Sequence, residues 1–84
     1  MIMKINHNLA VSESGFLFNP GTGESFTVNP IGAEIIAMLR NGKSRTEIID
    51  SITQLYQVDR NSFEKDLQDF NGILKTYNLL EKDE

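Results

Sequence analysis

The chain contains no cysteine, which excludes disulfide bonds, thiolate-bound zinc and a cysteine nucleophile together. Histidine occurs once, at His7, with no acidic partner nearby in the sequence, so a catalytic or metal-binding histidine is not expected. Apolar runs are only a few residues long, and the N-terminus lacks the apolar segment of a signal peptide. We therefore expect a cytoplasmic protein that does not enter a membrane.

The composition is that of a small globular protein. Of its 84 residues 39% are hydrophobic, and the mean hydropathy is −0.29, which suits one domain over residues 1–84. The net charge of −4 comes from residues 44–84, which carry nine acidic and five basic side chains, while residues 1–43 are balanced. An acidic surface repels phosphate backbones, so general nucleic-acid binding is disfavoured, although such an excess is also typical of a solvated helix face.

Three short β-prone segments open the chain, at residues 8–12, 16–18 and 25–28. In the third segment Phe26 and Val28 alternate with polar residues, as expected of a half-buried strand. The connection between the last two reads Asn-Pro-Gly-Thr-Gly, in which Pro20 presets φ for a turn and the glycines adopt positive φ readily. The pattern predicts a three-stranded antiparallel meander.

The glycine-rich connection does not match a phosphate-binding loop. A Walker loop places Lys-Ser/Thr after its last glycine and leads directly into a helix, whereas here Glu24 follows Gly23 and a strand comes next. The serines lack a nucleophile-elbow motif, and Asp66 and Asp69 share one expected helix with no third ligand in view. We therefore expect no catalytic activity, no metal and no cofactor.

Three helices are expected after the strands. The first has Asn29 as its N-cap and a proline at its first position, and Ser44 opens the second with a Ser-Arg-Thr-Glu capping box. The third starts near Asp59 and ends at Asn78, a residue suited to a left-handed cap. The expected core positions are Ile31, Ile35, Met38 and Leu39, then Ile48, Ile49, Ile52, Leu55 and Tyr56, then Phe63, Leu67, Phe70, Leu74 and Tyr77.

This α+β order of three strands and three helices resembles a winged helix-turn-helix, and the segment GFLFNPGTGESFTVNPIGAEIIAML resembles the signature of the PqqD family. The later segment GKSRTEIIDSITQLYQVDRNSFEKDLQDF is similar to the rest of the family pattern, so the resemblance extends from about residue 8 to the end. Three positions depart from it: Asn71, Gly72 and Asn78. The matching positions are Asn19, Pro20, Thr22, Gly23, Phe26, Val28, Asn29, Gly32 and Ala33.

The resemblance implies a peptide-binding module rather than an enzyme. Proteins of this family bind the leader of a ribosomally made precursor peptide and present it to a modifying enzyme, often a radical S-adenosylmethionine (SAM) protein. The leader pairs along the edge of the third strand and packs against the third helix, which is a case of strand addition. Carried onto this chain, the site consists of Ser25, Phe26, Thr27 and Val28 on the strand and Asp66, Asp69, Phe70 and Ile73 on the helix.

On a helical wheel Ile73 shares one flank of the third helix with the two aspartates, while Glu64 and Asn71 lie on the other. An aliphatic side chain beside two carboxylates suits a peptide with an apolar anchor and a basic residue; the alternative is that Ile73 only widens the core. Two other functions stay open. They are a winged-helix nucleic-acid binder, which would need a basic third helix, and a structural module that forms a homodimer through the free strand edge.

Overall fold

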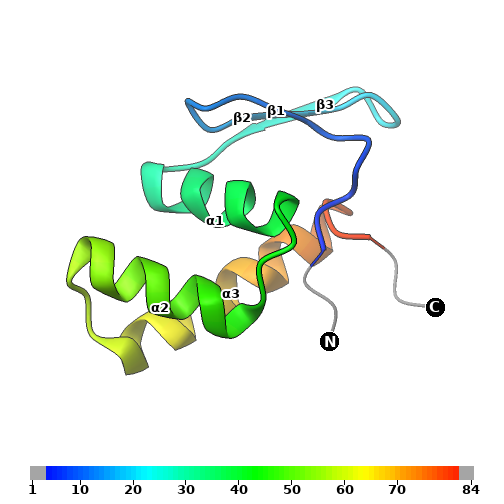
Figure 1. The fold of residues 1–84 in the computed structure, drawn as a ribbon. Coiled ribbons are helices and arrows are strands. Elements are labelled where there is room, and N and C mark those ends of the chain that lie inside the picture. The colour runs from blue at the N-terminus through cyan, green and yellow to red at the C-terminus, as the bar shows by residue number, and fades with distance from the viewer. Residues whose placement is uncertain (1–3, 82–84) are drawn as a thin grey trace.

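The computed structural model describes residues 4–81 as a three-stranded antiparallel sheet with all three helices on one of its faces (Figure 1). The strands lie in the order β1-β2-β3, so β1 and β3 are the two edges. The predicted α+β architecture, a meander followed by three helices, is confirmed. The elements are β1 (Ala10–Val11), β2 (Phe16–Asn19), β3 (Glu24–Thr27), α1 (Pro30–Arg40), α2 (Arg45–Tyr56) and α3 (Arg60–Thr76).

The glycine-rich connection is a hairpin turn between β2 and β3. The buried Asn19 holds it, because its carbonyl accepts the Gly23 N–H at 2.8 Å and its side chain accepts the Gly21 N–H at 2.9 Å. Gly23 has a φ of +77°, a conformation that costs glycine little. The sequence interpretation of this stretch as a turn is confirmed.

Each helix begins directly after the polar N-cap residue that the sequence indicated. Asn29 accepts the Gly32 N–H at 2.7 Å, and Asp59 accepts the Ser62 N–H at 3.0 Å. At the start of α2 the Ser44 hydroxyl accepts the Glu47 N–H at 3.1 Å, while the Glu47 carboxylate accepts the Ser44 N–H at 2.8 Å. These bonds satisfy N–H groups that have no partner within a helix, which fixes where each helix starts.

The core lies between the sheet and the helices. Its most buried side chains come from β2 and all three helices: Leu17, Ile36, Ile48, Ile52, Leu67 and Leu74. The predicted core faces are wrong at three positions, because Leu55, Tyr56 and Tyr77 are exposed, at 63%, 37% and 46%. All three lie at the C-terminal end of a helix. The apolar spacing continues to these residues, but no other element within residues 4–81 covers them.

Candidate functional site

The backbone of β3 offers hydrogen-bonding groups at the free edge of the sheet. Along one strand of an antiparallel pair, the N–H and C=O groups of successive residues point alternately toward the partner strand and away from it. Val28 donates its N–H to the Gly15 carbonyl at 2.9 Å, and Phe26 lies opposite Leu17 in the same register. The backbone N–H and C=O groups of residues 26 and 28 therefore point toward β2, and those of Ser25 and Thr27 point away from it, toward the free edge.

The side chains of β3 alternate between the two faces of the sheet. Phe26 is half-buried on the helical face, and Ser25 and Thr27 are exposed on the outer face. The Val28 side chain packs inward against the start of α1, because a Cβ added at Gly32 would lie 3.0 Å from the Cβ of Val28. Of the four strand residues predicted for the site, two thus offer the backbone edge, one offers a ring, and Val28 belongs to the packing of α1 on the sheet.

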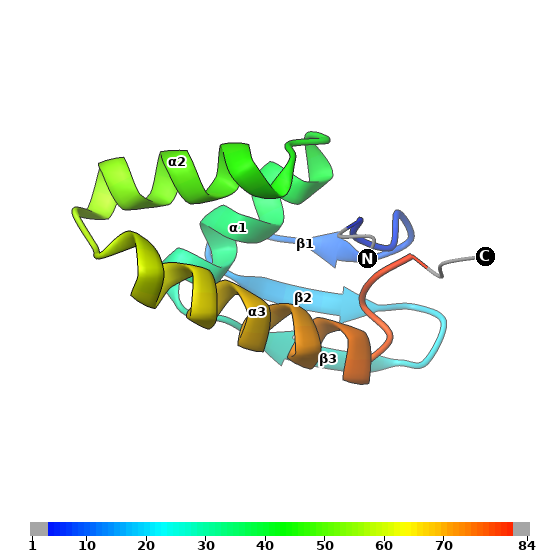
Figure 2. The same ribbon diagram turned by 90° about the horizontal axis from the view of Figure 1, so that it is seen from below.

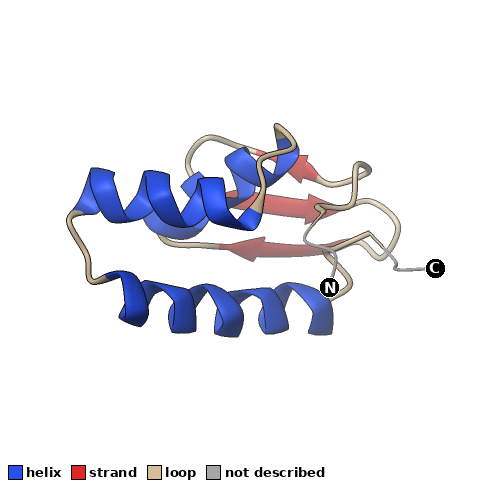
Figure 3. Cartoon of the chain, turned by 60° about the horizontal axis from the view of Figure 1, so that its bottom comes forward, coloured by secondary structure: helices blue, strands red, loops and turns tan. Residues whose placement is uncertain are grey.

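Helix α3 runs beside β3 on the helical side of the sheet (Figures 2 and 3). The Tyr77 ring at its C-terminal end lies 5.1 Å from the Phe26 ring, centroid to centroid. Ile73, one turn earlier on the same side of the helix, is 53% exposed. Phe26, Ile73 and Tyr77 thus form an apolar surface beside the edge strand, which we call the β3–α3 surface.

The remaining predicted helix residues differ in exposure. Asp66 and Asp69 are exposed, and neither takes part in an ion pair within residues 4–81. Phe70 is half-buried, and its ring tip would lie 3.5 Å from a Cβ at Gly32, so it packs under the start of α1. The structure therefore places Ile73 and the carboxylates on the surface of α3 and Phe70 beneath it.

The flank of α3 opposite Ile73 is largely covered. Asn71, which the helical wheel places on this flank with Glu64, is only 3% exposed. That flank is covered by the rest of the molecule, so it offers no open surface at this turn of the helix. Glu64 itself lies 3.5 Å from the Arg60 guanidinium, which also contacts Asp50 at 2.8 Å. The basic residue at the start of α3 is thus engaged with carboxylates.

Two further surfaces were not singled out from the sequence. Phe16 and Phe18 are exposed on the outer face of the sheet, at 46% and 37%. The sequence signal for this surface is their alternation with the buried Leu17, because successive side chains of a strand point to opposite faces of the sheet. The second surface is an open groove between β1 and α1, which no local pattern indicates because distant segments form it.

Neither a metal site nor a membrane span is indicated within residues 4–81. No three histidine, aspartate or glutamate side chains there are grouped so that they could hold a metal ion. None of the helices in this part of the chain is long and apolar enough to cross a membrane.

Comparison with known proteins agrees with this architecture. A solved structure described as TbiB1 in complex with the TbiA(beta) leader peptide has a TM-score of 0.85 and 35% sequence identity, over 98% of this chain and 99% of that chain. No curated protein sequence matches. The sequence profile of the family described as Coenzyme PQQ synthesis protein D (PqqD) matches residues 15–80, which include all of β2, β3 and the three helices. On this match and on the shared fold, the chain belongs to the PqqD family.

Proposed function

We propose that this chain binds the leader of a ribosomally synthesised precursor peptide as an added strand on β3. The main support is the outward-pointing backbone of Ser25 and Thr27 beside an exposed apolar wall on α3. An edge strand of this kind gives affinity through main-chain hydrogen bonds and specificity through the pockets beside it. The similar protein TbiB1, whose structure holds a leader peptide, supports the same function.

The β3–α3 surface defines the peptide that we expect. A leader residue opposite Phe26 points toward the helical side, where Ile73 and Tyr77 favour an apolar side chain. Because Tyr77 lies near Phe26 and Phe70 lies near Gly32, α3 runs opposite to β3, which places Asp66 and Asp69 beyond the Val28 end. A leader that pairs antiparallel to β3 has the residues N-terminal to its apolar anchor at the Val28 end of the strand. We therefore expect a basic residue N-terminal to the anchor.

The chain itself is proposed to be non-catalytic and to act by presentation. It holds the leader while a modifying enzyme acts on the rest of the precursor, and the family resemblance favours a radical SAM enzyme. In the absence of leader, the free edge of β3 can pair with β3 of a second copy, so we also propose a weak homodimer. Sedimentation at increasing protein concentration tests it, and a chain that stays monomeric at high concentration would exclude it.

Nucleic-acid binding has less support than peptide binding. In a winged helix-turn-helix the recognition helix needs exposed basic side chains. On α3 the Arg60 side chain is paired with Asp50 and Glu64, and Asp66 and Asp69 add negative charge to the exposed surface. No observation in the structure favours this function over the peptide site.

An amide chemical-shift titration of the ¹⁵N-labelled chain with the precursor peptide encoded beside its gene tests the proposal. We expect the largest shifts at residues 25–27 and around Ile73 and Tyr77. Shifts gathered around Glu64 instead, with residues 25–27 unmoved, would show that the site is wrong. If the precursor caused no shifts while a DNA duplex bound tightly, the proposed function itself would be wrong.

A further inference from the structure

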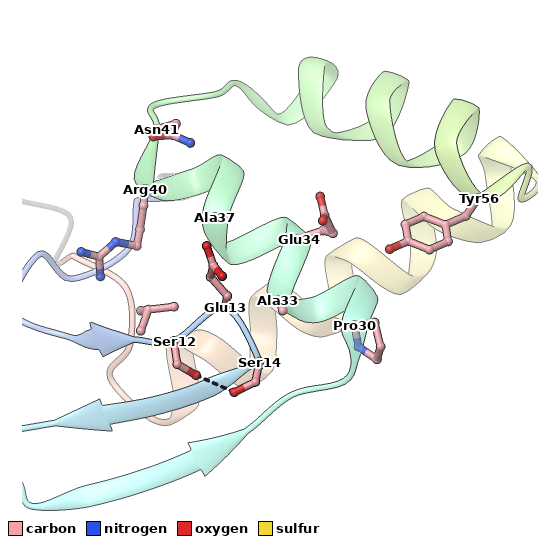
Figure 4. Close-up of a pocket in the computed structure, with 11 residues that line it drawn as sticks. Ser12, Glu13, Ser14, Pro30, Ala33, Glu34, Ala37, Arg40, Asn41 and Tyr56 are labelled. Atoms are coloured by element: carbon pink, nitrogen blue, oxygen red, sulfur yellow. Dashed lines mark hydrogen bonds between the residues drawn. The ribbon is translucent and has the colours of Figure 1, made fainter.

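A groove lies at the opposite edge of the sheet, between β1 and α1 (Figure 4). Its volume is about 650 Å³. Val11 and the β1–β2 turn form one wall, which a 2.9 Å hydrogen bond between the Ser12 and Ser14 hydroxyls holds together. Ala33 and Ala37 of α1 line the other wall with small side chains. A backbone lying in this groove can therefore come close to both elements.

The edge of β1 offers one free residue for strand pairing. Ser12 donates its N–H to the Phe16 carbonyl at 2.9 Å, and Val11 lies opposite Leu17. By the alternation of an antiparallel pair, the N–H and C=O of Val11 point away from β2, into this groove. The carbonyl of Leu9 points the same way, but the Arg40 guanidinium donates to it at 2.8 Å. Arg40 thus closes one end of the edge and leaves Val11 open.

The groove carries more negative than positive charge available to a ligand. Glu13 and Glu34 line it from the turn and from α1, and both are exposed. Neither makes an ion pair within residues 4–81. The positive charge of Arg40 is directed at the Leu9 carbonyl. An extended segment with small side chains and a basic residue therefore complements this surface.

We propose that this groove, here called the β1–α1 groove, binds an extended basic segment of the modifying enzyme while the leader occupies β3. The inference rests on the proposed function, because a protein that presents a peptide needs one surface for the peptide and another for the enzyme. Strand β2 separates the two edges, so both are accessible at once. The leader is assigned to β3 because that edge offers two outward residues and an aromatic wall, whereas β1 offers only Val11.

Photo-crosslinking separates this inference from the proposed function. A benzoylphenylalanine is placed at position 37 in the β1–α1 groove, at position 73 on the β3–α3 surface, or at exposed position 65 as a control. Each chain is mixed with the precursor and the modifying enzyme encoded beside it, and the products are identified by mass spectrometry. We expect position 37 to capture the enzyme, position 73 the precursor and position 65 neither.

The outcomes decide between the two ideas. Capture of the precursor at position 73 without capture of the enzyme at position 37 overturns only the β1–α1 groove. Failure at position 73 overturns the leader site. As a charge test, Glu34→Lys should weaken binding of the enzyme to the chain by about two- to five-fold, an effect that salt reduces. Asp50→Lys makes the same charge change on the exposed surface of α2, outside this groove and outside the leader site. Equal losses for both variants would show an effect of overall charge and contradict the inference.

Discussion

The Phe26 ring of β3 and the Tyr77 ring at the end of α3 lie 5.1 Å apart, with their planes tilted by 54°. This contact joins a strand to a helix terminus 51 residues further along the chain. Tilted aromatic pairs at this distance are attractive beyond the area that they bury. The pair therefore holds the last turn of α3 beside the edge of β3, and with it the residues of the β3–α3 surface.

Thr27→Pro should weaken leader binding by about three- to ten-fold, because one outward N–H is lost and a net hydrogen bond contributes about 1 kcal/mol. The sheet itself should survive, since proline is tolerated on an edge strand where its missing N–H faces away from the partner. Calorimetric titration with the precursor measures the loss, and Thr27→Ala is the matched control. Phe26→Pro, which removes an N–H directed at β2, should unfold the sheet. Equal affinities of Thr27→Pro and Thr27→Ala would rule out strand addition at this edge.

Ile73→Ala and Asp69→Ala should weaken leader binding in different ways. Ile73 loses apolar contact worth about 1 kcal/mol, and this loss should not depend on salt. Asp69 loses an exposed charge interaction on the order of 1 kcal/mol, which salt screens. Affinities measured at low and at high salt separate the two, with Lys65→Ala on the same helix as a control. An unchanged affinity for Ile73→Ala would place the leader elsewhere.

Gly32→Val should destabilise the fold by about 1–3 kcal/mol, the usual cost of overfilling a packed site. A Cβ at this position would come within 3.0 Å of the Val28 Cβ and 3.2 Å of the Asn29 side-chain oxygen. The Asn29 oxygen caps α1, so the crowding also disturbs the start of the helix. Urea unfolding followed by circular dichroism measures the change. A variant as stable as the wild type would show that the glycine has no packing role.

Gly72→Ala should stabilise the protein by about 1 kcal/mol, because glycine is a poor residue inside a helix. Nothing lies within 4 Å of a Cβ added there, so the methyl group meets open space. For a domain of this size the melting temperature should rise by about 4–8 °C. Thermal unfolding decides the matter, and a lower melting temperature would mean that α3 requires glycine for a reason other than packing.

The capping box of α2 should make stability depend on pH. The Glu47 carboxylate accepts a hydrogen bond from the Ser44 backbone N–H, and this bond is the main reason why the pKa of Glu47 lies below its ordinary value of 4.5. The hydrogen bond with the Ser44 side chain lowers this pKa further. The ionised carboxylate therefore stabilises the fold above that value, and its contribution is lost as the pH falls through the lowered pKa. Glu47→Gln should be less stable than the wild type at neutral pH, with a difference that shrinks in acid. Ser44→Ala removes only the hydroxyl and keeps the backbone N–H, so in that background the same substitution should retain most of its effect. A substitution without effect there would contradict this origin.

Much of the fold is local, and the sequence alone determined it. Asn29, Ser44 and Asp59 start their helices through bonds to residues three positions later, so both partners are close together in the sequence. The same holds for the Asn19 turn and for Asn78, whose φ is +59°. Of the candidate site, the edge strand and the exposed Ile73 followed from local pattern and family resemblance.

The rest depended on how the elements pack. Spacing along α3 places Tyr77 on the core face and Asn71 on one flank, yet the structure exposes the first and buries the second. A helical wheel shows which residues share a face, but not how far the covering elements extend or which flank they cover. The same limit applies to β3. The alternation places Ser25 and Thr27 together, but only the pairing of β3 with β2 decides that their backbone groups are the outward ones. The β1–α1 groove depends wholly on tertiary structure, because the bond from Arg40 to Leu9 joins residues 31 positions apart.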